Sequence, residues 1–154
     1  MQLKVLPSVC SSFGKGIPGS LGLSFAGSAD ASGSHCSKRC PHYGIRCYAE
    51  RLESFRKEYA AKLGRHSAQG VAATARAALV ELEDGARAGF VPVWFRFNVS
   101  GSLPARPSAD DVQALRALCS WLADRSVPIH LPLETRQKAT RYRRALRGLG
   151  VVVR

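Results

Sequence analysis

Short apolar runs alternate with helix-length segments along this chain, and this alternation limits the possible folds more than any other feature. The later runs cover residues 91–99, 127–133 and 151–153. In the first of them, Val93, Phe95 and Phe97 alternate with Trp94 and Arg96, as in a strand with two different faces. Strands separated by helices form mainly parallel sheets, because right-handed crossovers bring each strand back in the same direction. We therefore expect an α/β fold.

The segments between the runs have the periodicity of amphipathic helices. Apolar residues three or four positions apart predict a helix over residues 48–63. Gly64 is expected to end this helix, and Ser67 to begin the next one. Ser108 has the position of an N-cap for a third helix, and a fourth is expected over 136–147.

The 154 residues are expected to form a single domain, 1–154, which is long enough to bury its own core. Residues 1–34 read as a Gly- and Ser-rich lead-in that contains a first strand at 21–26, and residues 35–49 form a cysteine loop. Four strands are too few for a closed eight-stranded barrel. The expected architecture is therefore an open sheet or a partial (half) barrel.

The formal net charge of +12 points to anionic partners. No acidic residue follows Glu134, whereas basic residues are frequent there. The basic residues expected to contact nucleic acid or another polyanion are Arg136, Lys138, Arg141, Arg143, Arg144 and Arg147. A merely solvated surface is the alternative reading.

No apolar run approaches the length of a membrane span, so we expect no membrane contact. The N-terminal apolar stretch is too short for a secretory signal, and a cytoplasmic location is expected. In that compartment the five cysteines would be thiols, redox groups or metal ligands instead of disulfides.

Three cysteines lie within twelve residues, between the first strand and the first helix: Cys36, Cys40 and Cys47. The neighbouring basic residues are expected to favour thiolates, the form that binds metal. Three thiolates would leave one iron of a 4Fe–4S cluster open, and an iron–sulfur cluster is the favoured centre. Zinc is the alternative, with a fourth ligand from Cys10, His35 or His42. A zinc-stabilised nucleic-acid-binding module without catalysis is the corresponding alternative function.

A cysteine loop after the first strand, followed by a helix, resembles the radical S-adenosylmethionine enzymes, whose three cysteines are separated by three and then two residues. Here the gaps are three and six. The chain is more similar to a phage- and plasmid-encoded family named after gene product eighty-eight of a mycobacteriophage. That similarity rests on Ser24-Phe25, on Cys47-Tyr48-Ala49, on the segment from Arg96 to Ser100-Gly101, and on Leu131-Pro-Leu-Glu134.

Taken with the cysteine loop, these two likenesses imply an iron–sulfur protein. The second likeness implies that it is of phage or mobile-element type, and enzymatic activity is left open. The radical-enzyme likeness implies S-adenosylmethionine as a cofactor, near Ser100, Gly101 and Glu134. A strand-end turn at the first two residues and a first-turn helix acid at Glu134 are the structural alternatives.

Overall fold

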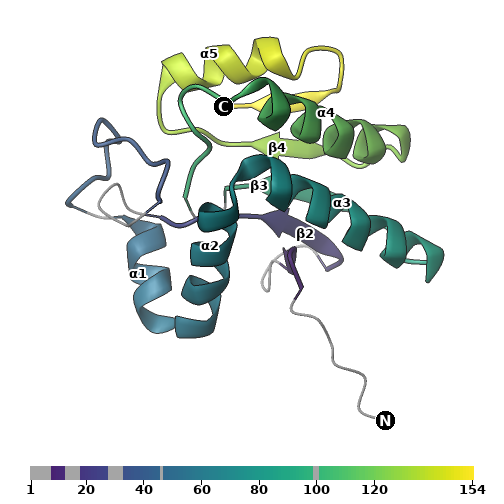
Figure 1. The fold of residues 1–154 in the computed structure, drawn as a ribbon, viewed down its shortest axis with the longest axis horizontal. Helices are drawn as coiled ribbons and strands as arrows, with labels where there is room; N and C mark the ends of the chain where they lie inside the picture. The colour runs from purple at the N-terminus through teal and green to yellow at the C-terminus, as the bar shows by residue number, and fades with distance from the viewer. Residues whose placement is uncertain (1–7, 13–17, 28–32, 46, 99–100) are drawn as a thin grey trace.

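The computed structural model describes residues 8–12, 18–27, 33–45, 47–98 and 101–154. Its centre is one sheet in which the strands follow one another in chain order. The strands are β1 (Ser11–Ser12), β2 (Ser20–Leu23), β3 (Trp94–Phe97), β4 (Ile129–Leu131) and β5 (Val151–Val153) (Figure 1). Strands β2 to β5 are parallel, and only β1 pairs antiparallel, at the β2 edge. The expected α/β fold with a mainly parallel sheet is confirmed, and the sheet stays open.

Two strands are shorter than their apolar runs. Within the run at 91–99 the strand covers Trp94–Phe97, and within the run at 127–133 it covers Ile129–Leu131. The prolines Pro128 and Pro132 flank β4 and have no N–H to donate to a neighbouring strand. Proline therefore limits the length of β4.

In the described part of the chain, five helices connect these strands. They are α1 (Tyr48–Phe55), α2 (Lys57–Gln69), α3 (Val71–Arg87), α4 (Ala109–Asp124) and α5 (Arg136–Ala145). Ser108 caps α4 as expected: its hydroxyl accepts a hydrogen bond from the Asp111 N–H at 3.0 Å, and the Ser108 N–H donates to the Asp111 carboxylate at 3.1 Å.

The helix expected over 48–63 is wrong in its bounds. It breaks at Arg56, and the second part continues past Gly64 and Ser67. Ser67 is buried, and its hydroxyl accepts a hydrogen bond from Ala26 N–H at 3.0 Å, so it serves the interior and not a helix start. The helix ends before Gly70, which has a φ of 90°, a left-handed value that glycine adopts readily.

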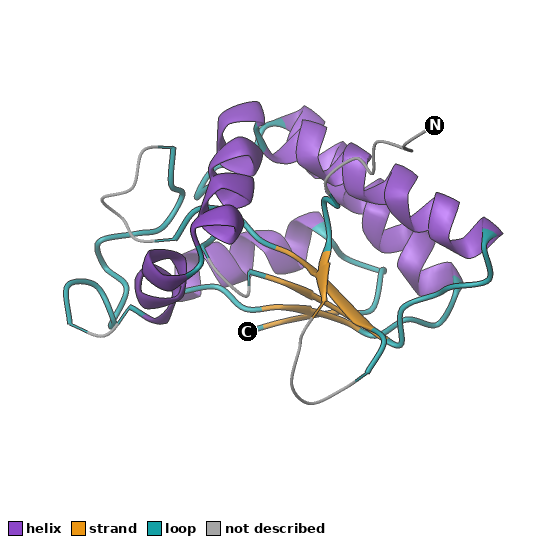
Figure 2. Cartoon of the chain, turned by 90° about the horizontal axis from the view of Figure 1, so that it is seen from below, coloured by secondary structure: helices purple, strands orange, loops and turns teal. Residues whose placement is uncertain are grey.

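All five helices lie on one side of the sheet (Figure 2). Parallel strands in chain order with right-handed crossovers produce this one-sided arrangement. The helix-facing side of the sheet forms the core, where Phe95, Phe97, Ile129 and Leu131 are buried against α3 and α4 residues such as Leu118. Such burial is the main source of stability for a fold of this size.

Candidate metal centre and basic groove

The cysteine loop lies beyond the carboxyl end of β2, on the side of the sheet edge where α/β proteins bind ligands (Figure 1). Backbone turns shape it: the Cys40 N–H donates to the Ser37 carbonyl at 3.0 Å, and the Tyr43 N–H to the Cys40 carbonyl at 3.0 Å. Gly44, with a φ of 70°, continues the turn toward α1. The loop thus folds back between the second and third cysteines.

Cys36 and Cys47 differ in their surroundings. Cys47 is the N-cap of α1, and its Sγ accepts a hydrogen bond from the Glu50 N–H at 3.5 Å. The pKa of Cys36 is raised, first by burial and further by the nearby Glu134 and Cys47, while Ser34 and Lys138 oppose this. The expectation that basic neighbours favour the thiolate is therefore wrong for Cys36.

A buried ion pair fastens the start of the loop to α5. Lys138, only 4% exposed, forms an ion pair with Glu134 and donates to the His35 carbonyl at 2.6 Å. Glu134 also accepts hydrogen bonds from the Ser37 N–H at 3.0 Å and from the Ser102 hydroxyl at 2.5 Å. Both oxygens of Glu134, expected to bind cofactor, are thus bonded within the chain.

These hydrogen bonds lower the pKa of Glu134. Burial by itself would raise it, but the bonds from Lys138 and Ser102 and the charge of Lys138 outweigh burial. Glu134 therefore holds its negative charge next to the cysteine loop. The spacing of the pair, i and i+4 at a helix start, was the available sequence signal, and the sequence interpretation missed it.

Gly101, expected near a cofactor, packs closely against the backbone of this same chain at residues 25 and 26. Its φ is 75°, and a Cβ at this position would lie 2.3 Å from the Phe25 carbonyl oxygen and 2.7 Å from that of Ala26. Only glycine fits this approach of the β3–α4 connection to the residues that lead into the cysteine loop. Ser100 lies outside the described residues.

A cavity of about 360 Å³ lies between the cysteine loop and α5, beside the Lys138 contact. Its lining includes His35, Cys36, Arg39, Thr135, Lys138 and Arg141. The His35 Nε2 is buried without a hydrogen-bond partner in the part of the chain that the structure describes. Burial, followed by the Lys138 charge, lowers the pKa of His35, so its ring is neutral at pH 7 and free to accept or donate a bond.

The fourth ligands proposed for zinc lie in different places. Cys10 is 3% exposed in the hydrophobic core, where its N–H donates to Glu81 at 3.2 Å and its carbonyl accepts from Lys62 at 2.9 Å. This place in the core, bonded to α2 and α3, does not support Cys10 as a zinc ligand. His42 is exposed in the loop turn. Among the described residues, no three His, Cys, Asp or Glu side chains are already arranged around a metal position.

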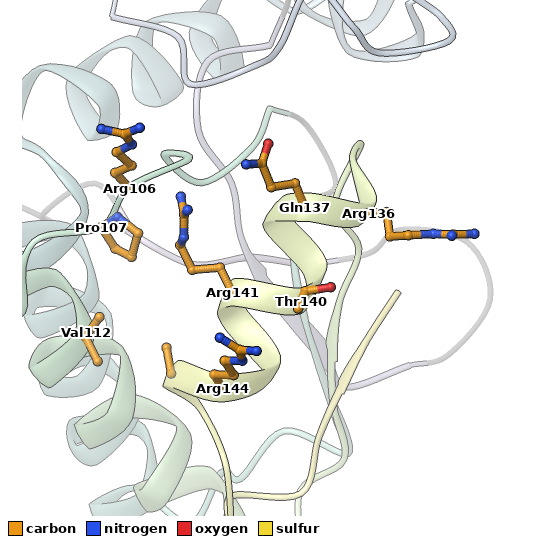
Figure 3. A pocket seen from close by; sticks show the side chains of 9 residues that line it. Arg106, Pro107, Val112, Arg136, Gln137, Thr140, Arg141 and Arg144 are labelled. Carbon is orange, nitrogen blue, oxygen red and sulfur yellow. The ribbon is translucent and has the colours of Figure 1, made fainter.

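A basic groove of about 1110 Å³ runs along α5 (Figure 3). Its charged lining consists of Arg106, Arg136, Arg141 and Arg144. Figure 3 shows Arg106, Arg141 and Gln137 directed toward the same space, whereas the Arg136 side chain extends to the opposite side. Arg106 comes from the loop before α4, and the sequence interpretation did not include it because that loop is far from α5 in the sequence.

The remaining basic residues of the predicted set do not line this groove. Lys138 is corrected, because it is buried in the ion pair with Glu134 and is not available to a partner. Arg143 donates to the Val153 carbonyl at 3.0 Å, toward β5. Arg147 is exposed beyond the end of α5. The groove thus keeps three of the six expected residues and adds Arg106.

Comparison with protein families, with curated proteins and with solved structures found no match to this chain. The resemblance to the gene-product-eighty-eight family therefore remains an expectation from short motifs. Within the described residues, the helices are too short or too polar to cross a membrane.

Proposed function

We propose that the chain binds a metal centre, an iron–sulfur cluster in first place, through Cys36, Cys40 and Cys47. The observation that carries this proposal is the fastening of the cysteine loop: the buried Glu134–Lys138 pair holds its first residues at the carboxyl end of the sheet. A buried charged pair is costly to form, so it is more typical of a loop that must be positioned than of a free connection.

The donor set fits a thiolate-binding metal. Three thiols lie on one loop, and no disulfide joins any of the five cysteines. Because the three thiols are not already arranged around one point, metal binding would have to bring them together, so binding and ordering of the loop would be coupled. Sulfur ligation suits both iron–sulfur clusters and zinc, and zinc remains the alternative centre.

The expected result of single Cys36→Ser, Cys40→Ser and Cys47→Ser substitutions is loss of essentially all bound iron from protein purified without oxygen. Serine is a poor ligand for this type of centre, since cluster iron is held by thiolates. Cys119→Ala is the control, because Cys119 is buried in α4 among core residues and should leave the iron content unchanged. Full iron content in the three serine variants would rule out the proposed ligands.

We also propose that the α5 groove binds an anionic partner, nucleic acid being the favoured one. Arg106, from the loop before α4, lines the groove together with Arg141 and Arg144 of α5. Arginine donates hydrogen bonds to phosphate oxygens in pairs. The net charge of +12 adds a long-range attraction for any polyanion.

This second proposal predicts a strong salt dependence. Reversing two groove charges with Arg141→Glu and Arg144→Glu should weaken duplex DNA binding and reduce the slope of log K against log salt by about 2, one for each lost phosphate contact. Arg87→Glu is the control, an exposed arginine at the end of α3, outside the groove. An unchanged slope in the groove variant, measured by fluorescence anisotropy, would contradict the proposal.

A further inference from the structure

One face of the sheet carries no helix in the part of the chain that the structure describes (Figure 2). The strand register places Arg96, His130 and Val152 side by side across β3, β4 and β5 on this face. Trp94 lies on the same face of β3, two residues before Arg96. We call these four residues the open-face strip. Val152 is 50% exposed, whereas its neighbour Val153 on the helix side is 7% exposed.

The open-face strip contains a pair of aromatic rings. The rings of Trp94 and His130 are nearly parallel, with an interplanar angle of 19° and centroids 6.1 Å apart. Burial, and then the charges of Arg96 and Arg154, lower the pKa of His130, which keeps the ring uncharged at pH 7. The result is two uncharged aromatic surfaces beside two arginines.

The open-face strip also holds polar atoms without partners. Neither ring nitrogen of His130 nor the Nε of Arg96 has a hydrogen-bond partner among the described residues. Buried polar atoms in native proteins are nearly always paired, and the exceptions call for a ligand, a water or a functional role. On this face the missing partners are therefore a sign of binding, independent of the ring geometry.

We propose that the open-face strip binds single-stranded nucleic acid, with bases stacking on Trp94 and His130 and the phosphates held by Arg96 and Arg154. Open sheet faces with aromatic side chains bind unpaired bases in this way, and stacking tolerates any base. The net charge of +12 favours a polyanion over a second copy of this equally basic chain. The site is separate from the cysteine loop and from the α5 groove.

The first test uses the fluorescence of Trp94. The chain has two tryptophans, and Trp121→Phe removes the other one while keeping a ring for Arg125, which lies 3.8 Å from the Trp121 ring centroid. Adding oligothymidylate of about 15 nucleotides should quench Trp94 in this variant, because a base stacks on its ring. Binding by anisotropy without any quenching, or no binding at all, would overturn the proposal.

The second test separates stacking from charge. Trp94→Leu with His130→Leu should weaken oligothymidylate binding at least tenfold and leave the salt slope unchanged, since stacking releases no counterions. Phe55→Leu, which changes an exposed aromatic of α1, is the control and should have no effect. Equal affinity of the double variant and the control would overturn the proposal. So would sedimentation showing a dimer that the double variant abolishes, since a second copy would then occupy the face.

Discussion

Gly101→Ala is expected to destabilise the protein by about 4 kcal/mol or more, the range reserved for severe steric or burial defects. The added Cβ would lie 2.3 Å from the Phe25 carbonyl oxygen, a backbone atom that cannot rotate away. Residues 25–26 lead from β2 toward the cysteine loop, so relief of the clash must move the β3–α4 connection away from the start of that loop. Urea denaturation followed by circular dichroism measures the change.

Gly148→Ala is the matched control for this prediction. Gly148 has nearly the same backbone conformation, with a φ of 83°, but nothing lies within 4 Å of an added Cβ. Its substitution should therefore cost only the left-handed backbone penalty of about 1–2 kcal/mol. Equal losses at both glycines would mean that backbone conformation alone sets the cost, and that the close approach at Gly101 does not exist in solution.

Lys138→Met should cost about 3–5 kcal/mol, the usual penalty for breaking a buried ion pair. Methionine keeps most of the length of the side chain but leaves the Glu134 carboxylate, 11% exposed, without its cation. It also removes the hydrogen bonds to the His35 carbonyl and the Ser102 hydroxyl. Lys57→Met, at an exposed position of α2, is the control and should change the free energy of unfolding by less than about 0.5 kcal/mol.

The same pair gives a pH signature. The folded-state pKa of Glu134 lies below its ordinary value of 4.5, so its contribution to stability is present above that value. It is lost as the pH falls through the lowered, folded-state pKa. Stability measured between pH 7 and pH 3 should therefore decline less steeply in Glu134→Gln than in the unaltered protein. Identical acid declines would show that the carboxyl group is not bonded as described.

Features that depend on neighbouring residues could be predicted from the sequence. The Ser108 cap and β5 needed only local chemistry, and both were expected where they occur. The break at Arg56 was missed because the apolar stripe continues through it, although Tyr48 and Phe55 are in fact exposed. Ser67 was misread as a helix start because its true partner, the Ala26 N–H, is 41 residues away.

The features of the candidate site also fall into those that follow from the order of the elements and those that depend on packing between distant segments. The parallel sheet brings the cysteine loop and Glu134 to one edge, and the likeness to radical enzymes had implied that Glu134 lies near this loop. The burial of Lys138 and the place of Arg106 in the groove depend on how α5 packs against distant segments. The open-face strip exists because the described helices all lie on one side of the sheet, which follows from the strand order. Which residues form the strip depends on the strand register, and the sequence alone does not give that register.

The most direct test of the proposed metal centre is metal and sulfide analysis of the unaltered protein purified without oxygen, with a visible spectrum before and after dithionite. We predict a brown protein with about four irons and four sulfides per chain, whose absorption is bleached on reduction, as for a thiolate-bound cubane cluster. A colourless, folded protein that holds one zinc, or no metal at all, would contradict the iron–sulfur assignment.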